Sequence, residues 1–133
     1  MILKYNEYLE KEKSLSFEQM NSIHDQMLDE ISGDTNALGI YEELIEKANK
    51  YAAIRAEWSL WDKTKKMERD DSRRICHDSL IVKFNMLARY LRIQGKESSW
   101  RDELGYEEGD RYNRKRIGDF ACYMVFINSI NSR

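Results

Sequence analysis

Proline is absent from this sequence of 133 residues, although an average usage of about 5% would supply six or seven. A proline inside a helix removes a hydrogen bond and clashes with the preceding turn, so a chain without it can sustain long helices. Residues that favour strands are also scarce: the only valines are Val82 and Val125, and the only threonines are Thr35 and Thr64. These absences predict an all-α fold.

Long hydrophobic runs are missing as well. The longest apolar stretch, Phe120 to Ile127, covers eight residues, whereas a membrane-spanning helix needs about 20. The first thirteen residues, MILKYNEYLEKEK, carry charges and contain no apolar region of signal-peptide length. We therefore expect neither a signal peptide nor a membrane span.

Cysteine is represented by Cys76 and Cys122 only. The two lie far apart in the sequence, without the paired spacing that a zinc site or a redox motif requires. Each falls within an apolar helical pattern, which favours a buried, reduced thiol. Together with the missing signal peptide, these features predict a cytoplasmic protein.

Charge of one sign does not dominate the chain. It has 22 basic and 24 acidic residues, for a formal net charge of −2, so no global field attracts it to nucleic acid or to an anionic membrane. The composition is 41% hydrophobic and 35% charged, which suits solvated helices around a real core. We expect one domain over residues 1–133, a compact bundle of about five helices with one long central helix.

Periodicity, caps and glycines predict where these helices lie. Ser16 and Gln19 form a capping box at the start of one helix, and Gly95 and Gly105 end two others. We expect helices at residues 2–13, 17–32, 38–67, 72–94 and 110–130, with a short helical turn at 100–104 before the last of them. The pattern leaves open a break near Ser59 in the third helix. Two apolar stripes mark buried faces: Met20, Ile23, Met27 and Ile31, and Leu80, Phe84, Leu87 and Leu91.

The third predicted helix carries two apolar stripes that a small bundle cannot easily cover together. The first comprises Leu38, Tyr41, Ile45, Ala48 and Ala52. The second, Ile54, Trp58 and Trp61, is displaced by roughly 120° if residues 41–61 form one continuous helix. This second stripe either packs inside the protein or remains open to a partner. Our leading hypothesis is a non-enzymatic binding or regulatory protein that makes protein–protein contacts through it.

The last predicted helix is apolar nearly all round from Phe120 to Ile127, which is typical of a helix that is central in a bundle or shared with a second subunit. Gly118 lies in its interior, where glycine costs about 1 kcal/mol relative to alanine. Its benefit would be the close approach of a neighbouring helix. With the tryptophan stripe, this apolar stretch favours a homodimer.

Two acidic clusters suggest a different function. Glu42, Glu43 and Glu46, followed by Glu68 and Asp71, have EExxE and ExxD spacing, and this pattern resembles the all-α nucleotide pyrophosphohydrolases of the MazG type. The resemblance implies that Glu43, Glu46, Glu68 and Asp71 hold magnesium against the phosphates of a nucleotide. Against it, the helical wheel places Glu43 and Glu46 roughly opposite the apolar stripe that contains Ile45, toward solvent.

The histidines offer a second metal hypothesis. His24, the pair His77 and Asp78, and Asp119 occur in the order H…HD…D, which resembles the helical HD phosphohydrolases. That resemblance implies a divalent metal bound by these side chains. The alternative is that each histidine is a hydrogen-bonded packing residue at the edge of the core.

Cations gather at the start of the last predicted helix, where they oppose the helix dipole. They are Arg111, Arg114, Lys115 and Arg116. Either they pair with the nearby Glu107, Glu108 and Asp110, or they contact a phosphate group. The second possibility predicts a nucleic-acid-binding protein, with a basic cluster at residues 63–74 extending the patch.

Overall fold

The computed structural model describes residues 15–58, 60–105 and 114–131. This part of the chain contains five α-helices and no strand, so the predicted all-α fold is confirmed. The helices are α2 (Phe17–Ile31), α3 (Thr35–Trp58), α4 (Lys63–Ile93), α5 (Ser99–Leu104) and α6 (Arg114–Asn131). The helix predicted at residues 2–13 lies outside the described residues. None of the described helices is long and apolar enough to cross a membrane.

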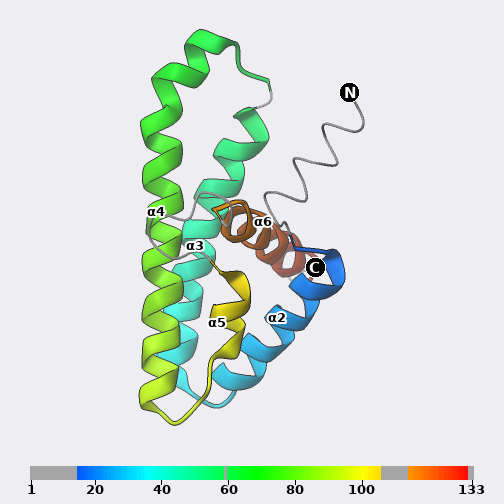
Figure 1. The fold of residues 1–133 in the computed structure, drawn as a ribbon, viewed down its shortest axis with the longest axis vertical. Helices are drawn as coiled ribbons and strands as arrows, with labels where there is room; N and C mark the ends of the chain where they lie inside the picture. The colour runs from blue at the N-terminus through cyan, green and yellow to red at the C-terminus, as the bar shows by residue number, and fades with distance from the viewer. Residues whose placement is uncertain (1–14, 59, 106–113, 132–133) are drawn as a thin grey trace.

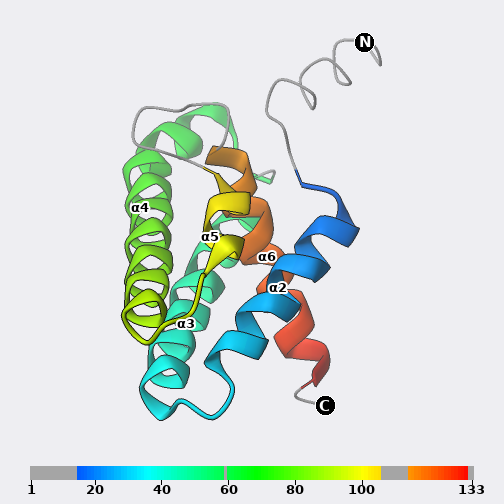
Figure 2. The same cartoon turned by 60° about the horizontal axis from the view of Figure 1, so that its bottom comes forward.

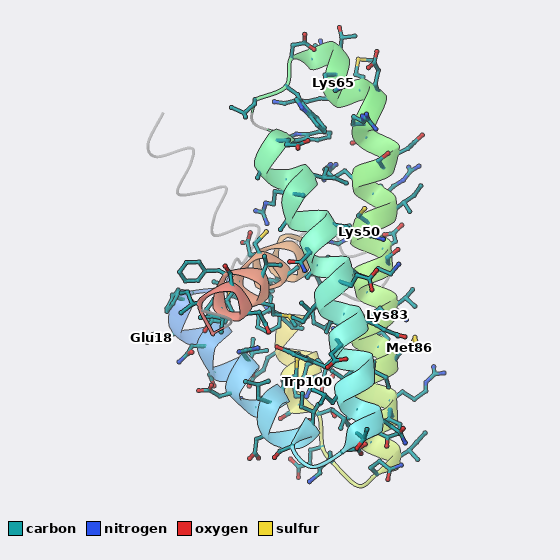
Figure 3. The ribbon with its side chains drawn as sticks, turned by 180° about the vertical axis from the view of Figure 1, so that it is seen from behind. Glu18, Lys50, Lys65, Lys83, Met86 and Trp100 are labelled. Atoms are coloured by element: carbon teal, nitrogen blue, oxygen red, sulfur yellow. The ribbon has the colours of Figure 1, made fainter. Side chains whose placement is uncertain are left out.

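Helices α3 and α4 form a long antiparallel hairpin (Figure 1). Helices α2 and α5 lie beside the half of the hairpin that is remote from the α3–α4 turn, so among the described elements the turn projects beyond the rest of the bundle (Figures 1 and 3). We call this projecting end, residues 54–73, the tip. Side chains at the tip therefore have few helices available to bury them.

Helix α6 is the central element of the bundle. It lies between α2 and the α3–α4 hairpin (Figure 2) and contacts α2, α3, α4 and α5. Its fully buried residues include Ile117, Phe120 and Met124, whereas Phe126 and Ile130 near its end are exposed. The apolar character of α6 is therefore explained mainly by its central position. Its predicted start at Asp110 falls outside the described residues.

Helix α2 begins as predicted. The Ser16 side chain accepts a hydrogen bond from the Gln19 backbone N–H at 3.1 Å, and the Gln19 side chain accepts one from the Ser16 N–H at 2.8 Å. This capping box satisfies two backbone donors at the helix start. The predicted stripe also faces the core, with Ile23, Met27 and Ile31 buried and Met20 partly buried.

The boundary predicted between the third and fourth helices is wrong, whereas the break near Ser59 that the sequence pattern leaves open agrees with the end of α3. Helix α3 ends at Trp58, and α4 begins at Lys63 and continues for 31 residues, so the expected boundary between Met67 and Ser72 does not exist and α4 is the longest helix among the described residues. Asp62 caps α4, because its side chain accepts a hydrogen bond from the Lys65 N–H at 2.8 Å. Within α4, Asp70 pairs with Arg73 and Asp71 with Arg74 at i,i+3 spacing, which supports the helix where a break was expected.

The continuous helix expected over residues 41–61 is therefore also wrong, and the two predicted stripes of the third helix change. On α3 the buried face is Ala37, Tyr41, Leu44, Ala48 and Tyr51, whereas Leu38 is 45% exposed. The face is rotated from the predicted one because α3 packs on both α4 and α6. Trp61 lies in the turn after α3 and not on the same helix as Trp58.

Gly118 lies where side chains of α3 meet α6. A Cβ atom at this position would lie 2.6 Å from the Tyr51 hydroxyl oxygen and 3.2 Å from Arg55 Nη1, which is closer than atoms can approach without displacement. Glycine at this position therefore leaves room for the ends of the Tyr51 and Arg55 side chains of α3 against α6. The Arg55–Asp119 ion pair, at 2.5 Å, joins the same two helices beside this contact.

Helix α5 is held against α2 by one carboxylate. Glu30 accepts hydrogen bonds from the Ser98 N–H at 2.9 Å, the Ser98 hydroxyl at 3.1 Å and Trp100 Nε1 at 2.6 Å. Ser98 has a left-handed backbone with φ of 51°, an uncommon conformation outside glycine that surrounding contacts must stabilise. The fully buried Trp100 then packs near Phe84, with ring centroids 6.4 Å apart.

Candidate functional site

The two tryptophans predicted as an interaction site meet at the tip. The ring centroids of Trp58 and Trp61 are 5.8 Å apart, and both side chains are half-buried. Each ring also has a cation over it: Lys65 Nζ lies 5.6 Å from the Trp61 centroid, and the Arg73 guanidinium lies 4.8 Å from that of Trp58. Figure 3 shows Lys65 at the projecting end of the hairpin. The aromatic pair is thus held in place without being enclosed.

A pocket of about 260 Å³ opens beside this pair. Its lining residues are Ile54, Glu57, Trp61, Lys65, Arg69 and Ser72. Ile54 and Trp61 supply an apolar wall, and Lys65 and Arg69 supply positive charge. This combination can hold an apolar side chain and an acidic group that lie close together on one ligand. Ile54 and Trp61 were singled out from the sequence, but their convergence depends on the turn at residues 60–62.

The four carboxylates of the pyrophosphohydrolase hypothesis are not brought together. Glu43 forms an ion pair with Lys83 at 2.8 Å, so in the antiparallel hairpin it lies level with Lys83. Glu68 is fifteen residues before Lys83 on α4, which corresponds to about 22 Å along the helix. Glu46 lies near Lys50 and Asp71 pairs with Arg74. No group of three or more metal-binding side chains of the histidine, cysteine or acidic types occurs among the described residues.

The histidines of the second metal hypothesis also lie apart. His24 Nε2 is 2.8 Å from the Tyr41 hydroxyl, whereas His77 packs edge-on against Tyr51. Tyr41 and Tyr51 are ten residues apart on α3, about 15 Å along the helix. Asp119 pairs with Arg55, and Asp78 is exposed on α4.

His24 belongs to a buried hydrogen-bonded chain. Asn128 Nδ2 donates to the Tyr41 hydroxyl oxygen at 3.1 Å, so the Tyr41 hydroxyl is available to donate its own proton to His24 Nε2. This arrangement needs the neutral imidazole. Burial lowers the pKa of His24, and the nearby Asp25 charge opposes that shift only in part. The His24 environment is therefore that of a packing residue that stays uncharged.

Of the four cations predicted to contact an anion at the start of the last helix, Arg116 is the one whose side chain is described. Its Nη1 donates to the Glu103 carbonyl oxygen at 3.1 Å, and it lines a pocket of about 340 Å³ together with Glu103 and Leu15. Arg111 and the side chains of Arg114 and Lys115 lie outside the described residues. The nucleic-acid contact remains a prediction.

A second cationic pocket was not predicted from the sequence. It has a volume of about 470 Å³ and is lined by Asn85, Ala88, Arg89, Arg92, Ile93 and Arg101. Arg101 is only 9% exposed. Its Nε donates to Asn85 Oδ1 at 2.7 Å and its Nη1 to the Gly105 carbonyl at 2.8 Å, both neutral acceptors. Burial lowers the pKa of Arg101, and the nearby Asp102 opposes that shift. Asp102 also pairs with Arg92 at 3.4 Å, so three guanidinium groups of this pocket face one carboxylate.

The two cationic pockets lie on the same hairpin, one at the tip and one near the end of α4. Both combine guanidinium or ammonium groups with an apolar wall, an arrangement suited to acidic ligands. Comparisons with models of protein families, with curated proteins and with solved structures found no match.

Proposed function

We propose that this chain is a non-enzymatic binding protein that makes protein–protein contacts through the tip of the α3–α4 hairpin. The observation that carries the proposal is the Trp58–Trp61 pair, which lies at a projecting end and beside a pocket without being enclosed. Tryptophan is among the residues most enriched at the energetically dominant positions of protein interfaces. Protein binding is therefore the function that the tip supports best.

The geometry of the tip suits rapid and specific docking. The rings of Trp58 and Trp61 are already ordered by mutual packing and by Arg73 and Lys65, so binding loses little side-chain entropy. The hairpin carries the α3–α4 turn away from α2, α5 and α6 (Figure 1), although Arg55 at the base of the tip still pairs with Asp119 of α6. The turn therefore leaves room for a partner.

The pocket also indicates the chemistry of the partner. Its apolar wall comes from Ile54 and Trp61, and Lys65 and Arg69 outnumber the single acidic lining residue, Glu57. A segment with an apolar side chain next to an aspartate or glutamate would bury the first and pair the second. We infer a partner that presents such a segment.

A comparison of variants tests the proposal. The wild-type chain is immobilised and used to capture proteins from an extract of its source cells, beside Trp61→Ala and Lys65→Glu. The control is Phe126→Ala, which removes a 54% exposed ring from α6. We expect one or more proteins to be captured by the wild type and by Phe126→Ala, with at least ten-fold loss for the tip variants. Equal capture by all four chains would overturn the proposal.

Two additional measurements keep the result interpretable. Thermal unfolding of each variant, followed by circular dichroism, shows whether a lost interaction reflects a lost fold. Treatment of the extract with nuclease separates protein partners from nucleic acid. If capture disappears after nuclease treatment and also in Arg116→Ala, the nucleic-acid function replaces the one proposed.

A further inference from the structure

Helix α4 has a second apolar face that no described element covers. Ile75, Val82, Met86 and Ile93 are 63%, 56%, 43% and 74% exposed. At about 100° per residue they fall within roughly 40° of one another around the helix. The buried residues Leu80, Phe84, Leu87 and Leu91 occupy the opposite side, which packs on α3 and α6. We call the exposed set the outer stripe; Figure 3 shows Met86 on the outer side of α4.

The outer stripe is symmetric along the sequence. Ile75 and Ile93 each lie nine residues from Phe84, and Val82 and Met86 each lie two residues from it. A second α4 placed antiparallel, with a two-fold axis level with Phe84, would therefore set Ile75 opposite Ile93 of the second copy and Val82 opposite Met86 of the second copy. Every apolar residue of the stripe then meets an apolar residue. Such self-complementarity is what a two-fold interface requires.

The charges beside the stripe fit the same arrangement. Asp78 and Arg89 lie on one side of it, six residues before and five residues after Phe84. In the antiparallel dimer, the side of one α4 that carries Asp78 and Arg89 lies next to the same side of the other α4. Because the two helices run in opposite directions, Asp78 of each copy comes next to Arg89 of the other. In parallel pairing the two residues would stay at levels about 16 Å apart along the helices and could not meet. Charge therefore favours the antiparallel arrangement over the parallel one.

The surroundings of these charges strengthen the argument. Arg89 and Ile93 line the second cationic pocket, which we call the arginine pocket, together with Arg92 and Arg101. The Asp78 carboxylate of the second copy would therefore arrive at a site of excess positive charge. Near the axis, Lys83 would approach its equivalent in the second copy, but Glu43 already pairs with it at 2.8 Å. The repulsion between the two Lys83 side chains is thus reduced by the Glu43 of each chain.

We propose that two copies of this chain pair through the outer stripe, with their α4 helices antiparallel about a two-fold axis near Phe84. This interface is distinct from the tip and goes beyond the function proposed for it. Lys63 lies twenty-one residues from Phe84, about 30 Å along the helix. The tips of the two copies therefore point in opposite directions, roughly 60 Å apart. If the tip binds a partner as proposed, the dimer carries two such binding sites and can contact two partner sites at once.

Sedimentation equilibrium over a range of concentrations tests the pairing. We expect the wild type to approach twice the monomer mass as concentration rises. Val82→Glu and Met86→Glu should remain monomeric, because each places two charges, one from each copy, in an apolar contact. Leu38→Glu is the matched control: it alters a 45% exposed apolar residue on α3 and should dimerise like the wild type. A wild type that stays monomeric up to its solubility limit would overturn the proposal.

Charge reversal tests the antiparallel geometry. Asp78→Lys and Arg89→Glu each create two like-charge contacts in a dimer of identical chains, so each should weaken pairing by roughly ten-fold. The double variant Asp78→Lys/Arg89→Glu restores both contacts and should recover. An equimolar mixture of the two single variants should form the mixed dimer, because both of its pairs are again opposite in sign. Failure of both the double variant and the mixture to recover would overturn the proposed geometry, and circular dichroism shows that each variant is folded.

Discussion

At the scale of single residues, Gly118 leaves room on α6 for the side chain of Tyr51 from α3. A Cβ atom there would lie 2.6 Å from the Tyr51 hydroxyl oxygen, and Tyr51 is buried. Gly118→Val should therefore lower the free energy of unfolding by about 1–3 kcal/mol, despite the better helix propensity of residues other than glycine.

Gly39 provides the matched control. It lies within α3, and the place that a Cβ atom would occupy there has no neighbouring heavy atom within 4 Å. Gly39→Ala should leave the stability unchanged or raise it by up to about 1 kcal/mol. Urea unfolding of both variants measures the difference. A Gly118→Val protein as stable as the wild type would contradict the tight packing of Tyr51 against Gly118.

His24 predicts a dependence of stability on pH. Burial lowers its pKa in the folded protein, so below the unfolded value of about 6.5 the unfolded chain binds more protons than the folded one. The free energy of unfolding should thus be highest above that pH and should fall as the pH decreases from there toward the folded pKa. His24→Gln removes the titrating group, so its stability should change less over this interval than that of the wild type. Denaturant unfolding of both proteins at about pH 7.5 and 5.5 checks the prediction. The same change in the free energy of unfolding between these two pH values in both proteins would refute it.

At the scale of helices, the start of α4 depends on Asp62. The Asp62 side chain accepts a hydrogen bond from the Lys65 N–H, so Asp62→Ala should cost about 1 kcal/mol and speed amide exchange in the first turn of α4. Ser72 would be the sensitive position if α4 began there. In the structure it lies inside the helix, and Ser72→Ala should change stability by no more than about 0.5 kcal/mol. A larger effect at Ser72 than at Asp62 would contradict the observed boundary.

The same region shows how far the sequence can predict this fold. The capping box of α2 and the buried face of α4 are local patterns, and both were predicted correctly. The boundary between α3 and α4 was not predicted correctly. A lone capping aspartate, Asp62, is a weak signal for a helix start, and the i,i+3 ion pairs at residues 70–74 support a helix through a polar stretch where a break was expected. The outer stripe was not predicted either, because α4 carries apolar residues on two opposite faces, which obscures its periodicity.

Sites that depend on packing between helices were the hardest to predict. Ile54, Trp58 and Trp61 were selected for a shared helix face, yet the two tryptophans meet because a turn brings Trp61 back beside Trp58. Glu43 and Glu68 have the spacing of a metal site, but the hairpin register places them at different levels. The arginine pocket joins residues of α4 to Arg101 of α5, and no sequence pattern predicts that contact.

At the scale of the whole molecule, the α3–α4 hairpin has a part that the other described helices cover and an outward part that they leave free. Helices α2 and α5 pack beside the half of the hairpin that is remote from the α3–α4 turn, and α6 crosses α3 and reaches Arg55. The α3–α4 turn and the outer stripe remain on the free sides of the hairpin (Figures 1 and 3). The first function proposed for the outward part is contact with a protein partner at the tip, and the second is contact with another copy along α4. Both place recognition on the α3–α4 hairpin.

Hydrogen–deuterium exchange of the wild-type chain, alone and with the protein that it captures, shows which surface the partner covers. We expect slower exchange over the tip, residues 54–73, in the complex, with no change over α2, whose residues lie away from the tip. Slower exchange over α2 or α5 with the tip unaffected would contradict this expectation, because the partner would then bind a surface other than the one that carries the tryptophans.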